Sequence, residues 1–114
     1  KNTKKEIMQI IYFDFDKSKI SNVSRSSLIN FLEKNKNNLS SYIIFGHADT
    51  KGSKDYNLNL SIKRAESVKK ILLNEGIPEK NVSIIGKGEN QLAVNTPDET
   101  EHPTNRRAEI KILN

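Results

Sequence analysis

Two charged residues fifteen positions apart, Asp49 and Arg64, are the strongest sign of chemistry in the sequence. Asp49 lies in the segment GHADTKG at 46–52, directly after an apolar run, and Arg64 lies in a stretch with helical spacing of apolar residues. A carboxylate can hold an ammonium group, and the forked guanidinium of arginine can hold a carboxylate. The pair could therefore clamp a ligand that carries both groups, although a structural salt bridge is the ordinary explanation for this spacing.

The composition indicates one small, polar domain. The chain has 114 residues, of which 34% are hydrophobic and 29% charged, which allows a single core and is too short for two ordinary domains. We therefore expect one domain over residues 1–114, with its core at about residues 7–113. Cysteine is absent, which excludes disulfide and thiol chemistry. No apolar run approaches the roughly 18 residues of a membrane span, so no direct membrane insertion by this domain is expected.

The net charge of +5 permits nucleic-acid binding but does not favour it. A nucleic-acid module would place its cations on one face beside stacking aromatic residues, whereas the aromatic residues here fall mostly inside predicted strands and helices. The lysines are better explained as solvated surface residues. In so lysine-rich a chain, a position that has arginine is one that needs a planar, forked donor. Three of the four arginines are Arg64, Arg106 and Arg107.

Two apolar runs predict strands that deliver acidic residues to one edge of a sheet. Residues 7–14 and 42–45 are rich in Ile, Tyr and Phe, so we expect strands covered on both faces. A helix is predicted between them, at about residues 21–37. Strands joined by such a crossover run parallel, so the loops that begin at Asp14 and Asp49 should emerge at the same end, where ligands bind in open α/β sheets. The helical pattern consists of Val23, Leu28, Phe31 and Leu32, with a stop at Asn37 and Asn38.

A second helix and two further strands follow. Helical spacing over residues 58–72 is ended by a glycine and a proline, which places Arg64 near the beginning of this helix. Residues 82–85 predict a short strand, and residues 108–113 alternate like a half-exposed strand at or near an edge. The loop 89–104 between them has no clear pattern, and a connection this long is usually functional or disordered. The order βαβαββ predicts an α/β (α+β) two-layer sandwich, in which helices cover a mixed parallel and antiparallel sheet.

Five sequence blocks, in order and at the right spacing, resemble the OmpA-like peptidoglycan-binding domains of the OmpA, Pal and MotB family. The blocks are FDFD at 13–16, GHADTKG at 46–52, YNxxLSxxRA at 56–65, GKGE at 86–89 and NRRAEI at 105–110. Together they extend the resemblance over roughly residues 8–112. The FDFDK and HAD segments favour the Pal branch, whereas the long loop before the last block favours the members that are linked to a β-barrel.

The resemblance implies non-covalent binding of peptidoglycan through the meso-diaminopimelate of its stem peptide. In the family, the residue that matches Asp49 holds the ammonium and the one that matches Arg64 holds the carboxylate. The resemblance places Phe15 and Asp16 in a loop that closes over the ligand, and Asn57 in a supporting polar contact. Replacing Asp49 or Arg64 by alanine is expected to abolish binding while the fold survives. The further supporting residues are Asp14, Thr50, Gly52, Asn105, Arg106 and Arg107.

Three polar residues directly before the last strand have a more local explanation. Asn105, Arg106 and Arg107 are expected to anchor loops by side-chain hydrogen bonds, and Arg107 could pair with Asp14 or another carboxylate of the site. His47 has no second His, Cys or acidic cluster at ligand spacing, so we expect a packed or hydrogen-bonded histidine. No metal and no cofactor are predicted.

The resemblance also implies a cellular context. It predicts a domain in the periplasm, associated with the outer membrane and cell wall of a Gram-negative-type bacterium, which tethers an envelope component to the wall. Its partners would be peptidoglycan and, as further candidates, other envelope proteins, with no nucleic acid among them.

Two alternatives stay open on the residues alone. One is a small metal-dependent phosphatase-like enzyme that uses Asp14 and Asp16 after the first strand, and the other is a basic nucleic-acid-binding module. The enzyme would need Mg²⁺ ligands, a downstream lysine and a larger domain, and no serine or cysteine triad is visible. We therefore predict a non-enzymatic protein.

Overall fold

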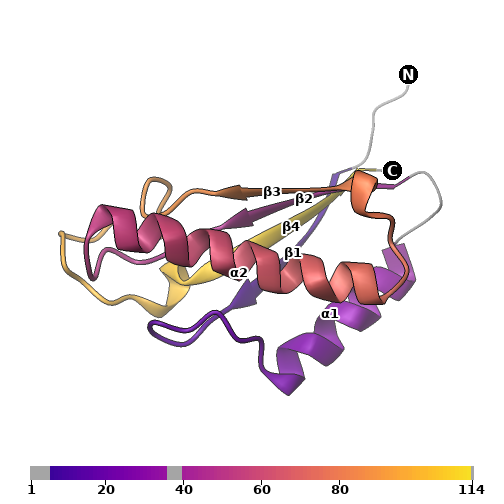
Figure 1. The fold of residues 1–114 in the computed structure, drawn as a ribbon. Coiled ribbons are helices and arrows are strands. Elements are labelled where there is room, and N and C mark those ends of the chain that lie inside the picture. Colours follow the sequence, from indigo (N-terminus) through magenta and orange to yellow (C-terminus); the bar gives the residue numbers. More distant parts are fainter. Residues whose placement is uncertain (1–5, 36–39, 114) are drawn as a thin grey trace.

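The computed structural model describes residues 6–35 and 40–113, which form one sheet with two helices (Figure 1). The elements are β1 (Glu6–Tyr12), α1 (Asn22–Asn35), β2 (Ser41–Gly46), α2 (Lys54–Asn74), β3 (Val82–Gly86) and β4 (Arg107–Leu113), with 3-10 turns at Glu79–Asn81 and Pro103–Asn105. The order is the predicted βαβαββ, and the α+β class is confirmed. The expected helix stop at Asn37 and Asn38 lies outside the described residues.

The four strands form a mixed sheet in the order β1-β4-β2-β3. Strand β4 runs antiparallel to both β1 and β2, whereas β2 and β3 are parallel. Strands β1 and β2 therefore run in the same direction with β4 between them, and their carboxyl ends lie at the same end of the sheet, as predicted. Strand β4, predicted to lie at or near an edge, is an inner strand next to the edge strand β1.

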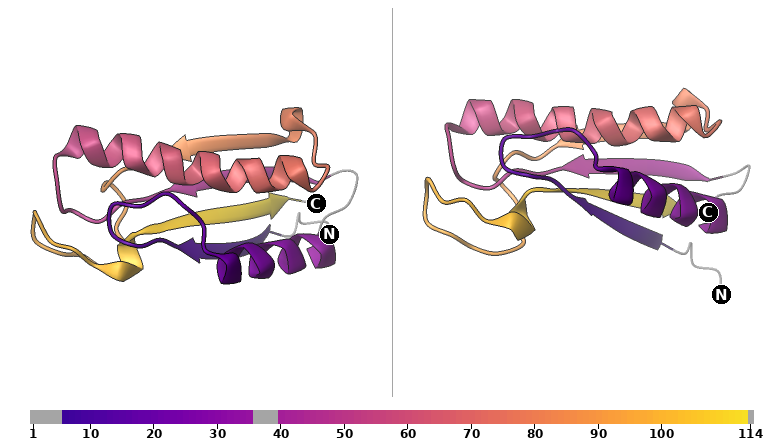
Figure 2. Two further views of the ribbon diagram at one scale, coloured as in Figure 1. Left: turned by 60° about the horizontal axis from the view of Figure 1, so that its bottom comes forward. Right: turned by 90° about the horizontal axis from the view of Figure 1, so that it is seen from below.

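Both helices cover the same face of this sheet, and that explains the errors in the predicted strand burial (Figure 2). Helix α2 packs against β2, β3 and β4, and α1 packs against β1. In β2, Tyr42 and Ile44 are buried while Ile43 between them is only partly covered, so β2 is not covered on both faces. In β1, Met8 is 48% and Tyr12 53% exposed. Because the helices leave one face of the sheet uncovered, buried and partly exposed residues alternate even in the inner strand β4. In the sequence, this alternation resembles that of an edge strand.

Apolar residues of both helices and of the covered face form one core. Leu28 and Leu32 of α1 are fully buried, whereas Val23, in the first turn of that helix, is exposed. The core contribution of α2 comes from Ala65, Val68, Ile71 and Leu72, and that of the strands from Ile11, Tyr42, Ile44, Val82, Ala108, Ile110 and Ile112. Within the described ranges, neither helix has the length and apolar character needed to cross a bilayer.

Two glycines let α2 approach the ends of β2 and β3 very closely. A Cβ atom on Gly46 would lie 1.8 Å from the carbonyl oxygen of Ser61, and one on Gly86 would lie 2.4 Å from Cγ1 of Ile62. Only residues without a side chain fit such a contact. The helix begins at Lys54, so Arg64 lies in its middle and not near its beginning as predicted. The close contact brings that middle turn onto the end of β2.

Candidate functional site

A cavity of about 220 Å³ opens at the end of the sheet, where β1 and β2 end. All five residues predicted to bind the ligand line it, and they come from three separate segments: Phe15 and Asp16 after β1, Asp49 after β2, and Asn57 and Arg64 on α2. The other lining residues are Lys51, Gly52, Tyr56, Leu60 and Glu99. Asp49 and Arg64 thus share one cavity, which is the arrangement that a clamp requires.

Arg64 is fully buried, with 0% of its surface exposed, and its guanidinium is bonded to the backbone. Nε donates to the carbonyl oxygen of Lys17 (2.8 Å), Nη1 to that of His47 (2.9 Å) and Nη2 to that of Asp14 (3.1 Å). The guanidinium also lies 5.2 Å from the ring centroid of Phe13. Three of its N–H groups are used in this way and two remain for other partners. Arg64 therefore fixes the loop after β1 against the end of β2.

Burial also sets the charge state of Arg64. Removal from water lowers its pKa to about 10, against the opposing effect of the nearby Asp49 carboxylate. A group with this pKa stays protonated at neutral pH, so the cavity wall carries a buried cation.

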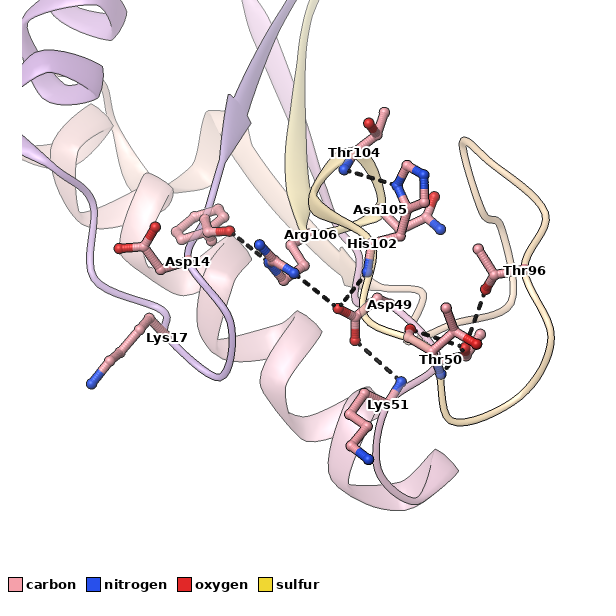
Figure 3. A network of polar contacts seen from close by, with 12 residues as sticks. Asp14, Lys17, Asp49, Thr50, Lys51, Thr96, His102, Thr104, Asn105 and Arg106 are labelled. Atoms are coloured by element: carbon pink, nitrogen blue, oxygen red, sulfur yellow. Dashed lines mark hydrogen bonds and ion pairs between the residues drawn. The ribbon is translucent and has the colours of Figure 1, made fainter.

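Asp49 is buried and its carboxylate is already bonded on both oxygens (Figure 3). Oδ2 accepts from the backbone N–H of His102 (3.1 Å) and from Nη1 of Arg106 (3.3 Å), and Oδ1 accepts from the backbone N–H of Lys51 (3.2 Å). Among the described residues the ion-pair partner of Asp49 is Arg106 and not Arg64. Asp49 and Arg64 therefore do not form the structural salt bridge that is the ordinary explanation for their spacing.

Arg106 and Asn105 hold loops together at this edge. Arg106 Nε donates to the carbonyl oxygen of Phe13 (3.0 Å), so its side chain links the loop after β1 with Asp49. The amide of Asn105 donates to the carbonyl oxygen of Val94 (2.8 Å) and accepts from the Val94 N–H (2.9 Å). These contacts are those of loop anchors, because both side chains are satisfied by protein groups.

Thr50 fixes the long loop before β4 over the end of β2 (Figure 3). Its hydroxyl donates to the carbonyl oxygen of Pro97 (2.7 Å) and accepts from the N–H of Thr100 (3.0 Å), and it lies 3.2 Å from the hydroxyl of Thr96. Its carbonyl oxygen accepts from the N–H of Glu99 (2.9 Å). The part of the loop around Glu99 is thereby held at the mouth of the cavity.

Helix α2 contributes two polar side chains to the cavity beside Arg64. Asn57 is buried and donates to Oε1 of Glu89 (3.0 Å) and to the carbonyl oxygen of Gly52 (3.5 Å). The hydroxyl of Tyr56 donates to the carboxylate of Asp16, which raises the pKa of the tyrosine. These contacts join the start of α2 to the loops on either side.

Arg107 lies outside the cavity, contrary to the predicted pairing with Asp14. Its Nε donates to Oε2 of Glu109 (2.8 Å), because alternate residues of β4 point to the same face of the sheet. Asp14 takes part in the site through its carbonyl oxygen, and its side chain lines a neighbouring cavity with Arg106. Asp14 and Asp16 therefore line different cavities, and the carboxylate pair that the phosphatase alternative needs does not converge.

His47 is buried on the face of the sheet that the helices do not cover, next to Arg107 and Glu109. Its Nε2 is 3.8 Å from Oε2 of Glu109. Burial, followed by the positive charge of Arg107, lowers its pKa to about 4, so the imidazole is neutral at pH 7. In the described part of the chain, no group of three or more His, Cys, Asp or Glu side chains is placed to hold a metal ion.

Sequence reasoning missed several residues of the cavity. Tyr56 stands beside Asn57 in a block that was recognised, so the spacing of α2 could have included it. Lys51 likewise stands in a recognised block, between Thr50 and Gly52, whereas Glu99 had no such signal because it lies in a loop without a pattern. His102 reaches the site through its backbone N–H, which no side-chain type can reveal.

Comparisons with known proteins agree with this geometry. A model of the OmpA family matches residues 12–106. Outer membrane protein A of Bordetella avium is 36% identical over 104 residues, which cover 90% of this chain and 53% of that protein. Outer membrane porin F of Pseudomonas aeruginosa is 34% identical over 104 residues, which cover 90% of this chain and 30% of that protein. The chain thus spans between about a third and a half of these two relatives.

Similarity extends to solved structures. The crystal structure of the peptidoglycan-associated lipoprotein from Burkholderia pseudomallei superimposes with a TM-score of 0.78 and 27% identity, covering 90% of this chain and 88% of that one. The family match includes the loop after β1, all of α2 and the loop that carries Asn105, so it spans the whole cavity. By its sequence, its fold and the extent of this match, the chain belongs to the OmpA family.

Proposed function

We propose that this domain binds peptidoglycan non-covalently, through the meso-diaminopimelate of the stem peptide, and so anchors an outer-membrane or envelope protein to the cell wall. The observation that carries the proposal is that Asp49 and Arg64 line a single cavity. The relatives support the context, because they are named as outer membrane proteins and as a peptidoglycan-associated lipoprotein. As an OmpA-family domain, the chain is a binding module and not an enzyme.

The size of the cavity suits one end of a ligand. A volume of about 220 Å³ is below the roughly 300–1,000 Å³ of sites that enclose a drug-sized molecule. The free end of diaminopimelate is compact and carries an ammonium and a carboxylate on one carbon. Such a head group is strongly hydrated, so binding requires that both charges find partners in the cavity at the same time. The rest of the stem peptide would lie outside.

Arg64 is suited to hold the carboxylate. Its three bonds to backbone carbonyls orient the guanidinium before any ligand arrives, and two N–H groups remain for a forked contact. Orienting the group in advance lowers the entropy lost on binding. A lysine at this position would keep the charge but lose the fork.

Asp49 is suited to hold the ammonium. Its carboxylate uses part of its acceptor capacity on Lys51, His102 and Arg106, which fixes its orientation in the cavity. A carboxylate in this position is buried and poorly hydrated, so a charged donor is an effective partner.

Three further residues complete the proposed site. Phe15 is partly exposed at the cavity and can cover the aliphatic chain of the ligand, while Asp16 offers a polar contact from the loop after β1 and Asn57 one from α2. A single head-group contact of this kind gives modest affinity. Many copies bound to a polymeric wall would then retain the protein through avidity.

The test is an Asp49→Asn variant, which preserves shape and most hydrogen bonds but removes the charge. We expect retention on purified sacculi, and binding of meso-diaminopimelate by calorimetry, to be lost while the circular dichroism spectrum is unchanged. Glu101→Gln, which removes the same charge from an exposed position outside the cavity, is the matched control. Wild-type retention of Asp49→Asn on sacculi would refute the proposed clamp.

A further inference from the structure

The mouth of the cavity carries an ion pair between two partly exposed side chains, Lys51 and Glu99. Lys51 Nζ lies 3.8 Å from Oε1 of Glu99, and the side chains are 46% and 58% exposed. Both residues line the same cavity as Asp49 and Arg64. A primary ammonium of the protein is therefore already paired with a carboxylate in the place where a ligand's ammonium is proposed to enter.

The fold holds Glu99 firmly in this position. Its backbone N–H donates to the carbonyl oxygen of Thr50 (2.9 Å), and its Oε1 accepts from the N–H of Gly52 (3.3 Å). Its φ is +56°, a left-handed conformation that is disfavoured for a residue with a long side chain. A conformation of this kind persists only where the surroundings enforce it, and such residues cluster at ligand sites. The bonds of the Thr50 hydroxyl to the neighbouring loop residues supply that constraint.

We propose that Glu99 is a further ligand-binding residue, which takes the ligand's ammonium together with Asp49, and that Lys51 occupies this carboxylate in the free protein. The inference rests on the proposed function, because it assumes a ligand with a free ammonium in this cavity. Binding then exchanges one primary ammonium for another on the same carboxylate. Lys51 swings into solvent on its flexible chain as the ligand enters.

The exposure of the pair makes this exchange feasible. An ion pair between side chains that are about half exposed contributes little to stability, so it can be broken with little loss. The partner that replaces Lys51 is also held by Asp49 and Arg64, whereas within residues 6–35 and 40–113 the ion-pair partner of Lys51 is Glu99. Lys51 is thus a weak competitor, tethered beside the site, and its presence lowers the apparent affinity.

Glu99 would also affect which ligands are selected. Because Asp49 and Glu99 line the same cavity as Arg64, the cavity favours a terminus that carries an ammonium over one that carries a carboxylate alone. The residue would therefore determine specificity for an amino-acid terminus.

The experiment measures the dissociation constant of meso-diaminopimelate for the full chain by titration calorimetry. Glu99→Gln keeps the acceptor for the Gly52 N–H and removes the charge, and should weaken binding about 3- to 10-fold. Lys51→Met removes the competing ammonium, and should tighten binding about 2- to 5-fold. In a Glu99→Gln background, Lys51→Met should give no such gain, because the carboxylate for which the two ammonium groups compete is gone.

Matched variants separate this exchange from a change of net charge. Glu101→Gln and Lys54→Met make the same charge changes at exposed positions that do not line the cavity, and both should leave the affinity unchanged. Equal affinity of Glu99→Gln and wild type, or weaker binding by Lys51→Met, would overturn the inference while the proposed function stands. Failure of the wild-type chain to bind both diaminopimelate and sacculi would overturn the proposed function, and this inference with it.

Discussion

Arg64 and Lys51 are both cations of the same cavity, but the fold holds them in opposite ways. Arg64 is 0% exposed and is bonded to three backbone carbonyls, whereas Lys51 is 46% exposed and has one ion pair at 3.8 Å. The buried cation cannot leave without disturbing two loops. The exposed one can change its partner with little effect on the rest of the chain. One wall of the cavity, with Arg64, therefore belongs to the folded core. The other, which we call the rim, consists of Lys51 and Glu99, whose side chains can change partners.

The largest effect is expected from Arg64→Ala, which leaves three carbonyl groups without their donor. We expect the free energy of unfolding to fall by about 3–5 kcal/mol, measured by urea denaturation. A small domain has only about 5–15 kcal/mol in total, so the survival of the fold that the sequence suggested is no longer expected for this variant. Arg64→Lys should lose less, because the charge remains, although a single ammonium cannot reach three carbonyls that are spaced around a planar guanidinium.

Arg25→Ala is the control for Arg64, since Arg25 is exposed on α1. Its change in stability should stay within about 0.5 kcal/mol. If Arg64→Ala were as mild as this control, the distinction between a structural wall and an adjustable rim would fail.

The next-largest effect is a loss of stability in acid, and it tests the buried part of the molecule through His47. The pKa of His47 is about 4 in the folded protein against 6.5 for an ordinary histidine, because it is buried beside Arg107 and Lys87, with Glu109 and the backbone of Gln91 opposing. Between these two pH values the unfolded chain binds more protons than the folded one. The contribution of the neutral His47 to stability is therefore fully present above pH 6.5 and is lost as the pH drops towards 4. The loss can reach about 3 kcal/mol.

His47→Leu should flatten that part of the pH dependence, while the backbone carbonyl at position 47 still accepts from Arg64. Urea denaturation at several pH values between 7.5 and 4.5, for wild type and variant, measures the difference. An equally steep decline in the variant would show that other groups cause the acid sensitivity.

A smaller effect is expected where the rim is attached. Thr50→Val keeps the shape of the side chain but removes the hydroxyl that binds Pro97 and Thr100, which should cost about 1–2 kcal/mol. Hydrogen exchange at the Thr100 N–H should speed up, because that donor loses its acceptor. Thr50→Ser keeps the hydroxyl and should exchange nearly as slowly as wild type. Similar exchange in Thr50→Val and Thr50→Ser would mean that the loop is held by other contacts.

The smallest effect on stability is expected from the rim itself. Breaking the exposed pair with Glu99→Gln should change the free energy of unfolding by no more than about 0.5 kcal/mol, even though ligand affinity changes. Thermal denaturation of the variant checks this directly. A large loss of stability would place Glu99 with Arg64 among the structural charges.

The sequence predicted the elements and the convergence of the site, because both depend on local patterns. Apolar runs located the strands, and the crossover rule placed the loops after β1 and β2 at one edge. The predicted burial of β1 on both faces was wrong, and β4 is an inner strand although its pattern resembled that of an edge strand. Their burial patterns depend on which face the helices leave uncovered, and Met8 or Tyr12 cannot show that by residue type alone.

The hydrogen bonds around the cavity could not be predicted from the sequence either, for a different reason. Arg64 binds backbone carbonyls of Asp14, Lys17 and His47, and every residue has a carbonyl, so no residue type marks these acceptors. The loop before β4 has no periodic pattern because Thr50 and Asp49, about fifty positions earlier, determine its shape. The choice of Arg106 as the ion-pair partner of Asp49 likewise depends on contacts between distant segments.

The direction of the strands has a mechanical consequence for the attachment to peptidoglycan that we propose. Strands β1 and β4 lie side by side along the sheet (Figure 1). Glu6 of β1 pairs with Leu113 of β4 at one end of the sheet, and the cavity lies at the other end, beyond Tyr12 and Arg107. A pull between Glu6 and a ligand held by Asp49 would therefore run along the strands. Both antiparallel ladders of β4 would be loaded in shear, with all of their hydrogen bonds sharing the tension, so the sheet would resist stretching better than it would resist the peeling of an edge strand.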